Sequence, residues 1–180
     1  MIPTEEQAKQ LWEKYQLPEG KRKHVGLVAK VAEFLATKCQ SSNVKCQINM
    51  PLLKAGALLH DIDKNVPSLP GEEHPDTEVR ILKEEGMAEV AALVKTHPLR
   101  AILDPLMSPK TREEKLLFLA DKMVKYEIIT VDERFKLWND EHLPADAQSL
   151  LDRAYPKVKA LEKEVFLLIG IEPSRVAQLV

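Results

Sequence analysis

The sequence is poor in glycine, aromatic residues and cysteine, and it has almost no net charge. Six glycines and 5% aromatic residues in 180 positions disfavour a glycine-rich β-barrel or β-sandwich. The formal charge of −2 provides no overall attraction to nucleic acid or to a membrane, so we expect neither as a partner. The two cysteines, Cys39 and Cys46, form no CxxC pair, which predicts free, buried thiols in a reducing compartment.

Long apolar runs are also missing. No stretch approaches the roughly 20 apolar residues that span a membrane, and residues 1–6 lack the basic and apolar regions of a signal peptide. We therefore expect a cytoplasmic protein. Apolar residues at 44% and charged residues at 30% are typical of a globular protein, and 180 residues are enough for one domain with a sizeable core.

Helical periodicity and helix-capping signals are what the sequence does contain. Thr4 with Gln7 and Thr111 with Glu114 have the spacing of capping boxes, which begin helices. The helices that we predict cover residues 4–15, 21–39, 50–59, 75–85, 87–96, 111–126 and 145–168, with a further helix starting near Asp132. We predict loops at 40–49 and 65–73, a loop or short helical turn at 100–109, and a tail at 171–180.

This pattern predicts an all-α fold in one domain. A short helical extension occupies residues 1–20, the core of the bundle occupies 21–135, and the helices of 136–180 pack on that core. No internal repeat and no low-complexity tract interrupts this organisation.

Several polar residues fall on apolar faces or at the ends of these helices. His24 continues the apolar face of its helix by one turn, while His60 and Asp61 follow the apolar run of residues 52–59. His74 stands just before a helix, His97 lies at the end of one, and Asp121 shares a face with Leu117, Ala120 and Val124. His142, in a polar loop, is left out of this set.

Each of these residues has an ordinary structural explanation. A single histidine on an apolar face is more often a core residue than a metal ligand. His60 and Asp61 could end one helix and cap the next turn. A buried Asp121 needs a cation, which could be a metal ion or the ammonium group of Lys54 or Lys122.

The set as a whole indicates a metal centre. His24, His60, Asp61 and Asp121 combine neutral nitrogens and carboxylates, which suit Fe, Mn, Co, Ni or Zn. His74 and His97 could serve a second ion, with the two oxygens of Asp61 as the natural bridge. Two such ions would hold a phosphate between them and lower the pKa of a shared water.

Three basic residues are candidates for binding the phosphate of a substrate. Lys64 lies one helical turn beyond His60 if that helix continues, and Arg100 and Arg134 are weaker candidates. For each of the three, an ordinary solvated surface position is the alternative. The run of Lys21, Arg22 and Lys23 beside His24 makes a modest case for attracting phosphate.

The order His24, His60-Asp61, Asp121 resembles the H…HD…D signature of the HD superfamily of metal-dependent phosphohydrolases. The resemblance covers roughly residues 21–135 and includes the local sequence Leu-Leu-His-Asp-Ile-Asp-Lys. It implies an all-α HD domain with a first metal on His24, His60, Asp61 and Asp121. His74, His97, Lys64 and the segment Leu-Ala-Asp-Lys at 119–122 are similar to the dinuclear branch that contains symmetrical dinucleoside tetraphosphate hydrolases.

We therefore expect a hydrolase of phosphoric esters or anhydrides that uses one or two divalent transition-metal ions to activate a water. Its substrate is expected to be a small phosphorylated molecule of the nucleotide type, with Asp61 orienting the water and Lys64 holding the phosphate. Two alternatives stay open: a mononuclear 5′-nucleotidase in which His74 and His97 contact the substrate, and a non-catalytic HD module that senses a nucleotide. The sequence indicates no particular oligomeric state.

Overall fold

The secondary structure is helical throughout. The computed structural model describes residues 1–42 and 46–180, and within these ranges it contains no β-strand, which confirms the predicted all-α fold. The elements are α1 (Glu5–Lys14), α2 (Glu19–Ser42), α3 (Met50–Leu59), α4 (Asp76–Glu84), α5 (Ala88–Val94), η1 (Leu99–Leu103), α6 (Arg112–Lys122), α7 (Val131–Asp140), α8 (Ala145–Ile169), η2 (Pro173–Arg175) and α9 (Val176–Leu179).

The predicted helix starts are confirmed where capping residues specify them. Thr4 and Thr111 form complete capping boxes with Gln7 and Glu114, and Thr130 forms a third with Glu133 at the start of α7. Each box satisfies two backbone N–H groups that a helix start leaves without partners. The start of a helix is therefore encoded within about four residues of sequence.

The helices differ from prediction at three places, one of which is the predicted tail at 171–180, where η2 and α9 form. α2 begins at Glu19 and continues to Ser42, so the first part of the predicted loop at 40–49 is helical, while residues 43–45 lie outside the described residues. α6 ends at Lys122 and not near Tyr126. Beyond it the chain folds back on itself, because the Ile129 amide donates to the Met123 carbonyl oxygen at 2.8 Å and the intervening segment makes a short turn.

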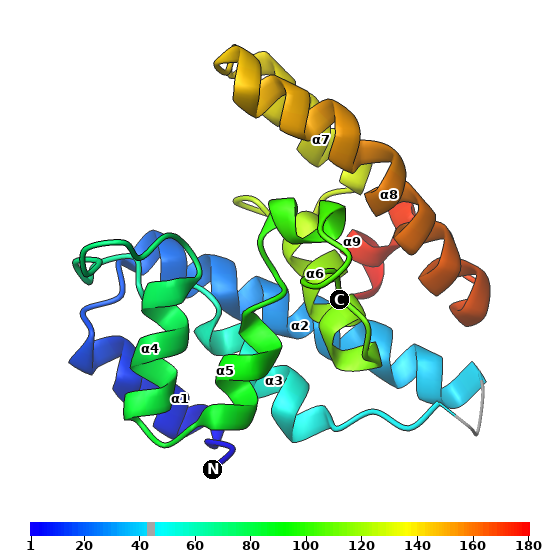
Figure 1. Ribbon diagram of the computed structural model, residues 1–180. Helices are drawn as coiled ribbons and strands as arrows, with labels where there is room; N and C mark the ends of the chain where they lie inside the picture. Colours follow the sequence, from blue (N-terminus) through cyan, green and yellow to red (C-terminus); the bar gives the residue numbers. More distant parts are fainter. Residues whose placement is uncertain (43–45) are drawn as a thin grey trace.

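α3 lies at the centre of the bundle (Figure 1). It packs against α1, α2, α5 and α6, and six of its ten residues are buried, as its nearly uninterrupted apolar sequence requires. α4 packs on α5, and η1 packs against α8. The residues at the end of α3 are consequently surrounded by other helices.

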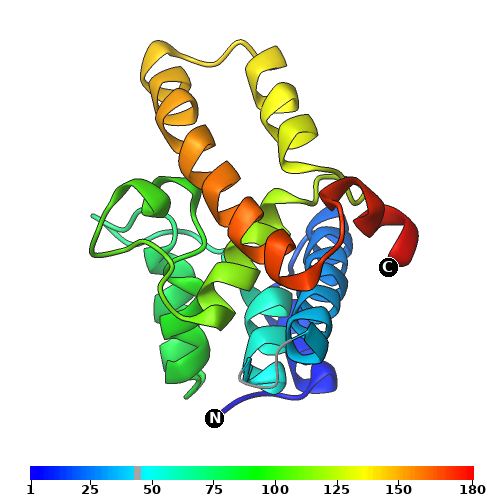
Figure 2. The ribbon, with the colours of Figure 1, turned by 90° about the vertical axis from the view of Figure 1, so that its right-hand side faces the viewer.

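α7 and the first half of α8 stand away from this bundle, and the second half of α8 packs back on it (Figure 2). α7 and α8 meet through the rings of Phe135 and Tyr155, whose centroids are 5.0 Å apart, and Phe135 also contacts Trp138 of its own helix at 5.1 Å. Among the described residues, no helix combines the length and apolar character needed to cross a membrane.

α1 is fastened to the end of α3 by one buried hydrogen bond. The indole Nε1 of Trp12 donates to the Leu58 carbonyl oxygen at 2.8 Å, which satisfies a carbonyl in the last turn of α3. Trp12→Phe keeps an aromatic ring but removes the donor and part of the buried indole, so we expect the free energy of unfolding to fall by at least about 1 kcal/mol. Urea denaturation would measure this loss, and an unchanged midpoint would contradict the role given to the bond.

Candidate metal centre

The site begins where α3 stops. His60 is the C-cap of α3, and the chain leaves the helix in tight turns in which the Ile62 amide donates to Leu59 and the Lys64 amide to Asp61. The helix therefore does not continue to Lys64, although its continuation was the condition for placing Lys64 one helical turn beyond His60. The turns nevertheless bring the Lys64 ammonium group to 3.1 Å from Asp61 Oδ1.

A first cluster joins three helices. His24 from α2 places Nε2 at 3.1 Å from Asp121 Oδ1 on α6, and His60 places Nε2 at 3.5 Å from the same oxygen. Asp61 Oδ2 lies 3.9 Å from the Nε2 of His24 and 4.0 Å from that of His60. The four residues that the sequence singled out for the first ion are thus brought together.

The orientation of His60 fits a metal ligand. Its Nδ1 donates to the Ala57 carbonyl oxygen at 2.9 Å, so Nε2 is the nitrogen that carries no proton when the ring is neutral. That Nε2 is buried and has no hydrogen-bond partner, although it points at the carboxylates of Asp61 and Asp121. A backbone carbonyl that fixes one nitrogen while the other faces carboxylates is the usual arrangement around metal-bound histidine.

A second cluster lies directly beside the first. The Nε2 atoms of His74 and His97 are 3.2 Å apart, and His97 Nδ1 donates to the Val94 carbonyl oxygen at 2.7 Å. The rings of His60 and His97 have centroids 5.0 Å apart, so the two clusters are in direct contact. Each of Asp61, His74, Glu78 and His97 offers one ligand atom within 4.8 Å of the others.

Two carboxylates in this region were missed by the sequence reasoning. Asp63 Oδ2 and the Lys64 ammonium group each lie 3.2 Å from His74 Nδ1, and His74 Nε2 faces His97. Glu78 is completely buried between His74 and His97. A signal for Glu78 was present, since it lies four residues after His74 and shares a helix face with Ile81 and Leu82.

The basic residues divide into two groups. Lys64 contacts Asp61 and Asp63. Lys21, for which the sequence made only a modest case as a phosphate-attracting residue, donates to Asp61 Oδ2 at 2.9 Å. Arg134 is half-buried with its Nε and Nη1 unpartnered, and the carboxylates of Asp121 and Asp61 oppose the fall in pKa that burial imposes on its guanidinium. Arg100 instead donates to Glu73 and to the His74 carbonyl oxygen, so it holds the loop before α4.

The ion pair considered for Asp121 exists with one of its two candidate partners. The buried Lys122 ammonium group donates to Asp121 and, at 2.8 Å, to the His97 carbonyl oxygen. Lys54 instead pairs with Glu5 and Glu33 on the outside of the bundle. Lys122 contacts Asp121 through Oδ2, and the histidines face Oδ1, so one carboxylate meets both kinds of partner.

Burial and the neighbouring charges together shift the pKa values of the groups in the two clusters. Burial lowers the pKa of His97 well below the usual value, which favours the neutral, metal-ligating imidazole. Burial alone would raise the pKa of Asp61, but His60, Lys64 and Lys21 outweigh it and hold that pKa well below the ordinary range. Burial and the neighbouring Asp63 raise the pKa of the Glu78 carboxyl well above its ordinary value.

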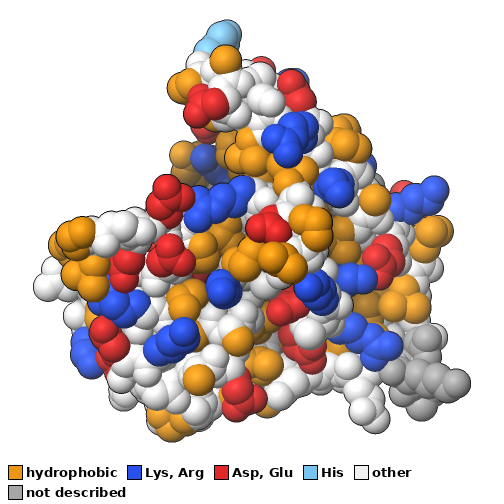
Figure 3. Space-filling model, in the orientation of Figure 1, with side chains coloured by type: hydrophobic (Ala, Val, Ile, Leu, Met, Phe, Trp, Pro, Cys, Tyr) orange, Lys and Arg blue, Asp and Glu red, His pale blue; other side chains and the backbone are white. Residues whose placement is uncertain are grey.

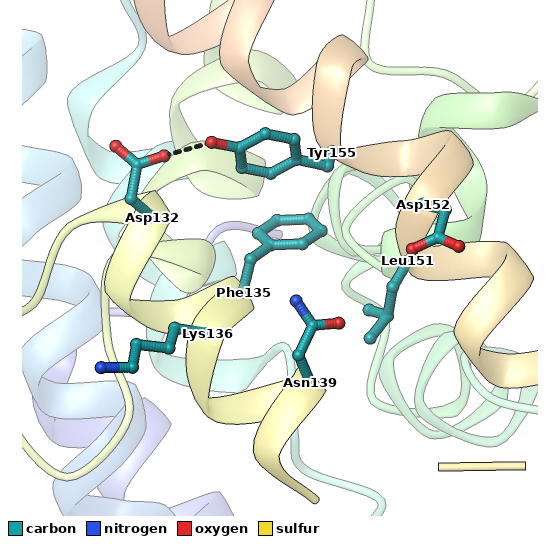
Figure 4. A pocket seen from close by; sticks show the side chains of 7 residues that line it. All are labelled: Asp132, Phe135, Lys136, Asn139, Leu151, Asp152 and Tyr155. Carbon is teal, nitrogen blue, oxygen red and sulfur yellow. Dashed lines mark hydrogen bonds between the residues drawn. The ribbon is translucent and has the colours of Figure 1, made fainter. Parts of the chain in front are cut away.

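The clusters are covered from the side seen in Figure 3, where histidine atoms appear only at the tip of the α7–α8 projection and charges of both signs are interspersed. A separate hollow of about 400 Å³ lies between α7 and α8 (Figure 4). Its lining includes Phe135, Leu151 and Tyr155, and the Tyr155 hydroxyl donates to Asp132 at 2.6 Å. None of the candidate metal ligands lines this hollow, so we assign the chemistry to the histidine clusters.

Comparison with known proteins agrees with this geometry. A family model described as HD domain matches residues 22–125, which is more than half of the chain. The matched segment contains all six of the histidines and aspartates singled out as metal ligands. No curated protein and no solved structure matches the chain.

Proposed function

This chain belongs to the HD-domain family, and we propose that it is a metal-dependent phosphohydrolase acting on a phosphate ester or anhydride of a small, nucleotide-like molecule. The observation that carries the proposal is the convergence of His24, His60, Asp61 and Asp121 around the unpartnered His60 Nε2. Two imidazoles and two carboxylates from three different helices form a ligand set for a divalent transition metal.

His24, His60, Asp61 and Asp121 would hold the first ion, and His74 and His97 would hold a second with Asp61 between them. Bound metal supplies a water of lowered pKa and a Lewis acid for the phosphoryl oxygens. The proximity of the two clusters supports the dinuclear branch of the family over a mononuclear nucleotidase, because His74 and His97 face each other through Nε2. A symmetrical dinucleoside tetraphosphate is accordingly the first substrate to test.

The chain's own cations are placed to bind the phosphate. Lys64 and Lys21 lie on opposite oxygens of Asp61, so a phosphate group bound beside that carboxylate would meet both ammonium groups. Arg134 adds a guanidinium that lies over the Trp138 ring at 4.5 Å and whose Nε and Nη1 have no hydrogen-bond partner within the described structure. Arginine donors in a partly desolvated site favour the developing negative charge of phosphoryl transfer.

A substrate panel tests the proposal. Protein loaded with Mn, Fe, Co or Ni would be assayed against phosphomonoesters, cyclic nucleotides, dinucleoside polyphosphates and guanosine tetraphosphate, beside an Asp61→Ala variant. We expect release of phosphate or nucleotide by the wild type with at least one metal. A wild type that binds a nucleotide but is silent over the whole panel would favour the sensing module instead.

Arg134→Gln tests the phosphate-binding group. A hydrogen bond to a charged partner contributes about 1.5–3 kcal/mol, so we expect kcat/KM to fall by roughly 10- to 150-fold while metal content stays unchanged. The matched control is Arg153→Gln, which changes an exposed arginine of α8 and should leave the kinetics unaltered. An Arg134 variant with wild-type kinetics would remove this residue from the substrate site.

A further inference from the structure

We propose that Glu78 is a direct ligand of the second ion, so that the second site consists of two histidines and two carboxylates: Asp61, His74, Glu78 and His97. The inference rests on the proposed metal-dependent function and adds to it a residue that the H…HD…D signature does not include.

The buried Glu78 carboxyl needs either a bound cation or a proton. Its side chain is fully inaccessible to solvent, and neither carboxylate oxygen has a hydrogen-bond partner. Glutamate is almost never fully buried unless it is paired, and a buried carboxylate without partners is strongly unfavourable. Within the described residues, the neighbouring ammonium groups are directed elsewhere: Lys64 contacts Asp61 and Asp63, and Lys122 contacts Asp121 and the His97 carbonyl oxygen.

The position of Glu78 is that of a ligand. Its Oε1 lies 3.1 Å from His97 Nδ1 and its Oε2 lies 3.7 Å from His74 Nδ1, but both nitrogens have other acceptors. His97 Nδ1 donates to Val94, and His74 Nδ1 faces Asp63. Glu78 is therefore not needed to orient either ring, and its oxygens remain available to an ion that His74 and His97 also bind.

The ligand set defines the class of ion. Two neutral imidazoles with two carboxylates offset the charge of a divalent cation completely, and a set with two oxygen donors suits Mn or Fe better than a soft ion. Replacing Glu78 by glutamine keeps the size of the side chain and removes its charge. The second ion should then bind less tightly. The first ion, on His24, His60, Asp61 and Asp121, should be unaffected.

The experiment measures metal binding and not turnover. Chelator-stripped protein would be titrated with Mn²⁺ by calorimetry, and bound metal would be counted by elemental analysis. We expect two ions in the wild type and, in Glu78→Gln, a second-ion Kd raised at least about tenfold, since loss of even an outer-shell partner weakens metal binding by about 10- to 100-fold. The control is Glu162→Gln in α8, which changes another buried glutamate, one that pairs with Lys159 and lies outside both clusters, and it should leave both affinities unchanged.

Thermal unfolding separates a ligand from a structural residue. Without metal, Glu78→Gln should melt at the wild-type temperature or above, because an uncompensated buried carboxyl has been removed. With Mn²⁺ added, the variant should gain less stability than the wild type. Equal lowering of the melting temperature with and without Mn²⁺ would show a structural role and overturn the inference.

The possible failures are distinguishable. If Glu78→Gln binds two ions with wild-type affinities, or if the wild type binds only one ion, Glu78 is not a ligand of a second ion, and the proposed hydrolase on the first ion still stands. If the wild type binds no divalent transition metal at all, the proposed function fails together with this inference.

Discussion

Asp61→Ala is expected to lower kcat/KM by on the order of 10³-fold or more and to reduce the bound metal. Among the described residues, Asp61 is the one whose carboxylate belongs to both clusters: Oδ2 faces His24 and His60, and Asp61 also offers a ligand atom close to those of His74, Glu78 and His97. Metal ions contribute several kcal/mol of transition-state stabilisation, and each 1.36 kcal/mol corresponds to about tenfold in rate.

The measurement pairs kinetics with elemental analysis. Asp132→Ala is the control, because Asp132 also accepts from two side chains, Tyr155 at 2.6 Å and Lys159 at 2.9 Å, but lies outside both clusters. Circular dichroism would show that both variants remain helical. An Asp61 variant that retains its metal and more than about a tenth of the wild-type activity would refute the central place given to this carboxylate.

Gly56→Val is expected to destabilise the fold by about 1–3 kcal/mol. Gly56 lies in the buried middle of α3, where a Cβ would stand 2.5 Å from Leu93 Cδ2 and 3.2 Å from Leu93 Cγ. Leu93 is itself buried in α5 and can move only by disturbing the core around it. The close approach of α3 and α5 matters for the site as well, because these two helices carry His60 and His97 at their ends.

Gly26 provides the control within the same protein. It lies inside α2, and a Cβ there would meet no atom within 4 Å. Gly26→Ala should therefore stabilise the protein by about 0.5–1 kcal/mol, the ordinary advantage of alanine over glycine in a helix. Chemical denaturation of both variants would show effects of opposite sign. A Gly56→Val protein as stable as the wild type would mean that α3 and α5 do not meet as closely as described.

The division of the chain at residues 20 and 135 stays a prediction, although α2 begins at Glu19, within the predicted amino-terminal extension. The placement of the cysteines is confirmed, because Cys39 and Cys46 are both free and buried. The phosphate-binding role predicted for Arg100 is the one that the contacts favour least, since its guanidinium is already engaged by Glu73 and the His74 carbonyl oxygen.

Local sequence patterns were enough to predict the helical class, most helix starts and the set of histidines and aspartates that could meet. These features are local: a capping box spans four residues, and the face to which His24 or Asp121 belongs follows from the helical period. The order of His24, His60-Asp61 and Asp121 also carried the resemblance to the HD superfamily, which the family match supports.

Which polar groups share one centre, and which have other partners, depends on how the helices pack against one another. The burial of Glu78 depends on its contact with His97, which follows α5. Asp63 contacts His74 only because the fold brings together two residues that are eleven positions apart in the sequence. The sequence offered Lys122 and Lys54 as candidate partners of Asp121. In the structure, of these two lysines only Lys122 contacts Asp121. The physical reason is that the free energy of a buried charge depends on every neighbour brought by other helices, and no local pattern contains those neighbours.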